Sequence, residues 1–113
     1  SNKDVVGLYN SCDPAVLKLI CMAIEAADRE SVPINLCGQM SGVPIYTMLL
    51  LGLGLRCFSV TPIAIPEVKN VCRHVTIEQC QAVAQRVKTL ENARDIKSYL
   101  KEELKKCVPE WGQ

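Results

Sequence analysis

One cysteine stands where the sequence could present a reactive group. Cys37 ends a short apolar run at positions 32–37, and Gly38 follows it directly. An unperturbed thiol has a pKa of roughly 8.5, so it is mostly protonated at pH 7 and can act as an acid. Because glycine has no side chain, Gly38 lets a ligand approach the thiol closely. We expect Cys37 to be catalytic and Gly38 to contact a substrate.

The other cysteines favour packing over chemistry. The chain has seven cysteines, at positions 12, 21, 37, 57, 72, 80 and 107. None of them forms a CxxC pair, so we expect neither a structural zinc site nor a dithiol redox pair, and no metal ligands in this chain. Most lie on apolar stripes, where a free thiol packs as a small hydrophobe in a reducing compartment. This pattern favours a cytoplasmic protein.

Two further sequence features do not predict a reactive or binding site. His74 is the one histidine of the chain and lies in no motif, so we expect it at the surface. Gly52 and Gly54 precede an apolar run instead of following one, which is the wrong order for a phosphate-binding loop. We expect these two glycines to end a helix.

Composition and charge exclude several classes of function. The 113 residues suit one modest domain, and 49% hydrophobic with 22% charged residues is typical of globular proteins. The net charge of +1 provides no general attraction for nucleic acid or an anionic membrane. The longest apolar run, at 48–55, is far shorter than the roughly 20 residues of a membrane helix. We therefore expect no nucleic-acid partner and no membrane span.

Helices and short strands must position Cys37. Asp13 before Pro14 predicts a helix start, and apolar residues at helical spacing continue it to Arg29. The runs at 32–37 and 56–60 predict buried strands, with a helix from Pro44 between them. Three helices are expected afterwards, opening near residues 66, 76 and 92.

This alternation predicts an α/β fold with two parallel strands joined by crossover helices. A closed (β/α)8 barrel takes about 250 residues, so we interpret the chain as the last part of such a barrel, with a helical C-terminal tail. Residues 1–113 would form one C-terminal fragment of a barrel domain. Within it, 1–75 would supply barrel strands and helices, and 76–113 the C-terminal helices. In such a fold Cys37 would lie at the carboxyl end of a strand, where catalytic groups of barrels gather.

Four segments of the chain resemble the phosphoenolpyruvate-utilising enzymes. They are LCGQMSG at 36–42, LLLGLGL at 49–55, FSV at 58–60 and IPEVK at 65–69. Within that family they are most similar to enzyme I of the bacterial sugar phosphotransferase system. The similarity runs from about residue 4 to residue 73, so the last two helices rest on pattern alone.

The resemblance implies an activity for the parent protein. It would transfer the phosphoryl group of phosphoenolpyruvate to a protein histidine, using magnesium, and so supply a histidine-containing phosphocarrier protein. Cys37 matches the family's catalytic cysteine, which protonates the enolate carbon to give pyruvate. Gln39 and Val43 depart from the family, which usually has glutamate and often aspartate there.

Two functions remain open at this stage. The family's magnesium ligands, phosphate-binding arginines and phosphorylated histidine all lie upstream of this chain, so we expect the isolated chain to be inactive. It would then be a fragment whose start lies inside a longer protein, with no bound metal of its own. The alternative is a non-catalytic oligomerisation or interaction module derived from such a barrel. Both readings predict a homo-oligomer, because unpaired strands invite association.

Overall fold

The computed structural model describes residues 12–36 and 39–109, and it opens with the helix that the sequence predicts. This helix, α2, spans Pro14–Arg29. Asp13 caps it, since its carboxylate accepts a hydrogen bond from the Ala15 backbone N–H at 2.8 Å. Pro14 occupies the first turn, where no backbone donor is needed. Both predicted ends of the helix are confirmed.

A helical segment follows the connection at 30–36 and forms the centre of the molecule. Two short 3₁₀ turns, η1 (Gln39–Gly42) and η2 (Pro44–Tyr46), lead into α3 (Thr47–Leu53). Gly54 ends α3 in the left-handed conformation with φ 110°, as the sequence predicts. Gly52 has another role, because it lies inside the helix. A Cβ atom added to Gly52 would lie 2.0 Å from the Cys80 carbonyl oxygen.

Three more helices complete the described chain. After η3 (Pro62–Ala64) come α4 (Ile65–His74), α5 (Ile77–Val87) and α6 (Ala93–Cys107). The predicted capping box of α5 is present, with the Gln79 N–H donating to Thr76 Oγ1 at 3.1 Å and the Thr76 N–H donating to Gln79 Oε1 at 2.8 Å. Asn92 caps α6 in the same way, since its Oδ1 accepts from the Asp95 N–H at 2.9 Å.

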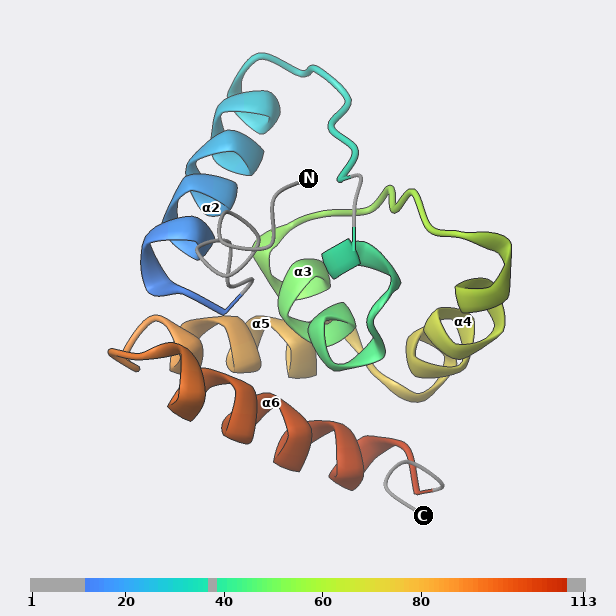
Figure 1. Ribbon diagram of the computed structural model, residues 1–113. Helices are drawn as coiled ribbons and strands as arrows, with labels where there is room; N and C mark the ends of the chain where they lie inside the picture. Colours follow the sequence, from blue (N-terminus) through green and yellow to red (C-terminus); the bar gives the residue numbers. More distant parts are fainter. Residues whose placement is uncertain (1–11, 37–38, 110–113) are drawn as a thin grey trace, which may run out of the picture.

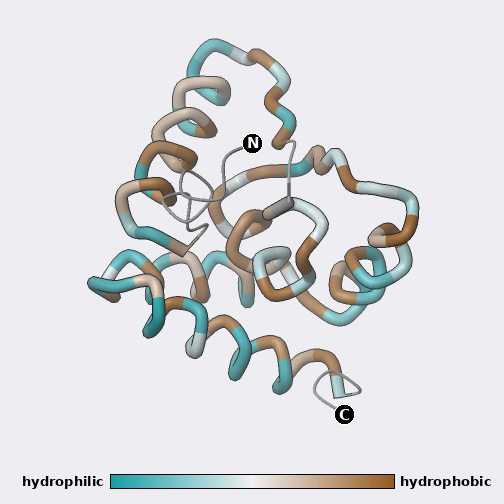
Figure 2. Tube along the Cα trace, in the orientation of Figure 1, coloured by the Kyte–Doolittle hydropathy of each residue, from teal (hydrophilic) through white to brown (hydrophobic). Residues whose placement is uncertain are grey.

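The helices are arranged around α3 (Figure 1). Helix α5 crosses beneath it, α6 runs along the lower edge, α2 rises at the left and α4 lies at the right. The most extensive contact joins α3 to α5, and α2 packs less extensively on its neighbours. The largest fully buried apolar side chains come from α3, α4, α5 and α6 and the segments next to them: Leu49, Leu50, Leu55, Val71, Val83, Ile96, Leu100, Leu104 and Val108. Figure 2 shows the corresponding hydrophobic stretches on the inner sides of these helices.

The predicted α/β fold is wrong for the residues that the structure describes. They form a helical domain without strands, and the backbone pairing between the runs at 32–37 and 56–60 is limited, among these residues, to one isolated parallel bridge between Leu36 and Phe58. The first run is not buried on both faces, since Val32 is 56% exposed and Asn35 is also exposed. Pro33 has no N–H to give to a ladder. A short apolar run does not by itself distinguish a strand from other structure, and here the core is made by helices.

Candidate functional site

The two predicted site residues, Cys37 and Gly38, lie outside the described residues. The structure describes the chain on both sides of them, up to Leu36 and again from Gln39. The site can therefore be built from these two flanks and from the segment 57–60, which both flanks contact.

The flank before Cys37 is attached through its backbone. The Leu36 N–H donates to the Cys57 carbonyl at 3.4 Å, and the Ser59 N–H donates to the Leu36 carbonyl at 3.1 Å. These two bonds form the parallel bridge between Leu36 and Phe58. Leu36 and Phe58 are half-buried and pack against the hydrophobic core. Both polar backbone groups of Leu36, the residue before Cys37, are therefore hydrogen-bonded.

The flank after Gly38 is attached to the same segment through a side chain. Ser41 is fully buried in η1, and its hydroxyl donates to the Ser59 carbonyl at 2.6 Å. Met40, the residue before it, is 8% exposed and belongs to the core. The flanks of Cys37 therefore converge on one residue, Ser59.

Ser59 also has a polar side-chain partner. The Asn35 amide donates to the Ser59 hydroxyl oxygen at 2.7 Å, and both residues are exposed. Because the amide nitrogen can only donate, the Ser59 hydroxyl accepts this bond and keeps its own O–H as a donor. A carboxylate or carbonyl oxygen of a small ligand is a suitable acceptor for that donor.

Sequence reasoning did not single out the residues that hold this site. Asn35 and Ser59 were treated as parts of two apolar runs, and Ser41 as part of a motif. The signal that could have revealed them was the presence of polar residues at positions 35 and 59, inside segments that were predicted to be buried on both faces. A polar residue in such a segment needs a hydrogen-bond partner.

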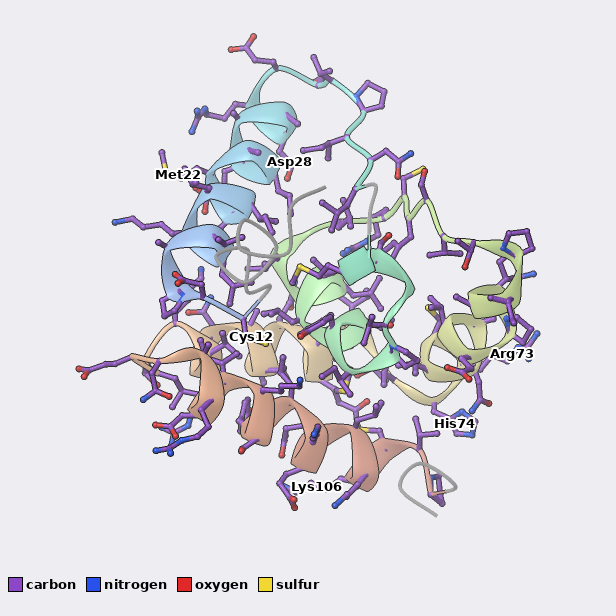
Figure 3. The ribbon with its side chains drawn as sticks, viewed as in Figure 1. Cys12, Met22, Asp28, Arg73, His74 and Lys106 are labelled. Atoms are coloured by element: carbon purple, nitrogen blue, oxygen red, sulfur yellow. The ribbon has the colours of Figure 1, made fainter. Side chains whose placement is uncertain are left out.

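The remaining thiols divide into buried and exposed groups, with Cys21 and Cys107 in between. Cys12 and Cys80 are fully buried, which confirms that they pack as small hydrophobes, whereas Cys57 and Cys72 are exposed. Burial raises the pKa of Cys80 to about 11 and also raises the pKa of Cys12. Figure 3 shows Cys12 at the base of α2, beside the core. These buried thiols are protonated at neutral pH and have no solvent access for catalysis.

His74 is placed at the surface, as the sequence predicts. It ends α4 and is exposed, and its Nδ1 lies 2.7 Å from the Asn70 carbonyl oxygen. Figure 3 shows His74 and Arg73 together at the outer end of that helix. The bond to Asn70 lies within a single helical turn of α4.

Over 12–36 and 39–109, no three His, Cys, Asp or Glu side chains come together in a way that could hold a metal ion. In the same part of the chain, no helix has both the length and the apolar character needed to cross a membrane. The cluster around Ser59 consists of hydroxyl, amide and backbone groups.

Comparison with known proteins gives a family match over the region that contains this cluster. The model described as "PEP-utilising enzyme, PEP-binding domain" matches residues 1–77. A phosphoenolpyruvate-protein phosphotransferase of Mycoplasma pneumoniae is 35% identical over 105 residues, which are 93% of this chain and 18% of the relative. One of the same name from Cupriavidus necator is 40% identical over 83 residues, covering 74% of this chain and 14% of the relative. A third, from Bacillus subtilis, is 30% identical over 104 residues, or 92% of this chain and 18% of the relative. The chain thus spans less than a fifth of the length of these relatives.

Proposed function

The chain belongs to the family of PEP-utilising enzymes, and we propose that it supplies the proton donor of a phosphoenolpyruvate-protein phosphotransferase. In that reaction the phosphoryl group leaves phosphoenolpyruvate for a protein histidine, and an enolate of pyruvate remains. The Cys37 thiol gives its proton to the methylene carbon of the enolate. The S–H bond breaks, a C–H bond forms, and the products are pyruvate and a thiolate that solvent protonates again.

The double attachment of the Cys37 flanks supports this proposal most directly. Leu36 is bonded to the segment 57–59 through its N–H and its carbonyl, and Ser41 is bonded to Ser59 from the other side. General acid catalysis requires the proton donor to stay within hydrogen-bond reach of the reacting atom. Fixed flanks limit the positions open to the thiol between them. We propose that Gly38 leaves room for the substrate beside it.

The two departures from the family affect the acidity of the thiol. A carboxylate near a thiol disfavours the thiolate and raises the pKa of the thiol. The chain has Gln39 and Val43 where the family usually or often has acidic residues. We therefore propose that the pKa of Cys37 lies below that of the matching thiol in relatives that have those acids. A lower pKa makes the thiol a stronger acid, and it leaves less of it protonated at neutral pH.

Other parts of the reaction are proposed to lie outside this chain. The described residues do not fit a magnesium site, because no carboxylate cluster is present among them. We propose that any magnesium ion and the phosphorylated histidine belong to segments present in the longer relatives, and that the acceptor is a histidine-containing phosphocarrier protein. The division at residue 75, a cytoplasmic location and homo-oligomer formation stay predictions. Light scattering of the purified chain tests the last of these.

A chimeric enzyme tests the proposed function. The matching C-terminal part of the Bacillus subtilis relative is replaced by this chain, and pyruvate formation from phosphoenolpyruvate is measured with magnesium and a phosphocarrier protein. The chimera should form pyruvate, and Cys37→Ala should slow the reaction about 100-fold or more, which is the usual contribution of a positioned acid. Cys57→Ala is the matched control, because Cys57 is an exposed thiol in the neighbouring segment. Equal rates for the two variants would contradict the role of Cys37.

A further inference from the structure

A groove separates α2 from the pair formed by α3 and α5. Its wall on α2 is one continuous helical face that runs from Pro14 to Glu25, and the volume of the groove is about 490 Å³. Eleven helical steps cover about 16 Å, which is the length of the wall that α2 provides.

The walls of the groove are mainly apolar. Its apolar lining side chains come from α2, α3 and α5, from the connection to α6 and from α6 itself: Pro14, Leu17, Met22, Leu49, Leu53, Ala84, Val87, Leu90 and Ile96. A groove of this size with a few polar groups among apolar side chains has the usual composition of a small-molecule site.

The charged side chains at the rim of the groove are two lysines and one glutamate, and they differ in their partners. Lys18 on α2 and Lys88 at the C-cap of α5 both line the groove and are exposed, and neither forms an ion pair within the described residues. Glu25 is the one acidic lining residue, and its Oε1 accepts a hydrogen bond from the Cys21 thiol at 3.5 Å. Lys88 lies near enough to Cys21 to act on the ionisation of that thiol across the groove. Two ammonium groups thus remain for an anion at the mouth.

We propose that this groove binds a single-chain aliphatic carboxylate, such as a medium-chain fatty acid anion. The carboxylate is held between Lys18 and Lys88, and the alkyl tail lies against Leu17, Leu53 and Leu90. The apolar walls favour an aliphatic tail, and the two lysines favour an anionic head. The groove shares no residue with the cluster around Ser59, so this inference does not depend on the role of Cys37.

Titration of the full 113-residue chain with decanoate tests the inference, with binding measured by calorimetry. Saturable binding is expected, and octanoate should bind about 15-fold more weakly, because each methylene contributes about fourfold in affinity. Decyltrimethylammonium, which has the same tail and a cationic head, should bind at least about tenfold more weakly than decanoate. A double variant, Lys18→Glu with Lys88→Glu, should lose decanoate binding by a similar factor. The matched control is Lys69→Glu with Lys101→Glu, two exposed lysines outside the groove.

Three results would overturn the inference. They are the absence of saturable decanoate binding up to millimolar concentration, equal binding of the anionic and cationic amphiphiles, and unchanged binding by the double variant. Circular dichroism and the urea midpoint establish that each variant is folded. A dimer whose interface covers the groove, detected by light scattering and not dissociated by decanoate, would assign the groove to a second copy of the chain instead.

Discussion

Two regions of this molecule are held in different ways. Where α3 meets α5, the backbones touch at Gly52 and the side chains around them, such as Leu50 and Ala84, are at most 2% exposed. Around Ser59, the chain is held by a few hydrogen bonds between short irregular segments, and Asn35 and Ser59 are exposed. The contrast separates a scaffold fixed by close packing from a site fixed by individual polar contacts. Substitutions should therefore act on stability in the first region and on the chemistry of Cys37 in the second.

The largest effect is expected from Gly52→Ala. The added methyl group would lie 2.0 Å from the Cys80 carbonyl oxygen, so α3 and α5 must separate. The free energy of unfolding should fall by at least about 3 kcal/mol, measured by urea denaturation. Gly42→Ala is the control, because its added Cβ lies 3.5 Å from the Ala64 Cβ, an ordinary contact. If both variants lose equally little free energy of unfolding, the backbones of α3 and α5 are not in close contact at Gly52.

High pH should weaken the scaffold through Cys80. Burial raises the folded-state pKa of Cys80 to about 11 from an ordinary value of 9.0. The contribution of the protonated Cys80 thiol to the free energy of unfolding is complete below the ordinary pKa. It is lost as the pH rises through the folded-state pKa. The free energy of unfolding should fall by about 2 kcal/mol between pH 9 and pH 11. Cys80→Ala should flatten this dependence, and Cys57→Ala should not; a wild-type curve that is already flat would exclude the effect.

Ser41→Ala tests whether a polar contact around Ser59 affects both stability and Cys37. It removes the 2.6 Å bond to the Ser59 carbonyl and should cost about 1 kcal/mol of stability. It should also change the rate at which iodoacetamide alkylates Cys37, because one flank of the thiol is released. Ser98→Ala, an exposed serine on α6, is the control and should leave both measurements unchanged. Altered stability with unaltered alkylation would limit Ser41 to a structural role.

At a helix cap, an effect on stability alone is expected. Thr76→Ala removes the side chain that accepts from the Gln79 N–H and should lower the free energy of unfolding by about 1 kcal/mol. Thr61→Ala is the matched control, since Thr61 precedes η3 without a side-chain cap bond. A difference between them below the error of urea denaturation would show that the cap of α5 is not needed once α5 is packed on α3.

Local signals in the sequence were sufficient for most of the helices. The pairs Asp13 with Pro14 and Thr76 with Gln79 act within a few residues, and the helices begin where these signals predict. The strands were predicted wrongly, because pairing depends on neighbours that a local pattern does not contain. The polar contacts of the site were missed for the same reason. Ser41 and Ser59 are 18 residues apart, and nothing local to either one indicates the other.

The pH dependence of Cys37 decides whether this thiol is the proton donor. Pyruvate formation by the chimeric enzyme is measured from pH 6 to pH 10, together with the rate at which iodoacetamide alkylates Cys37 in the same protein. If the thiol is the acid, pyruvate formation falls and alkylation rises with one shared pKa, and Gln39→Glu moves both curves to higher pH. Two different pKa values, or pyruvate formation that continues unchanged after Cys37 is alkylated, would contradict the claim.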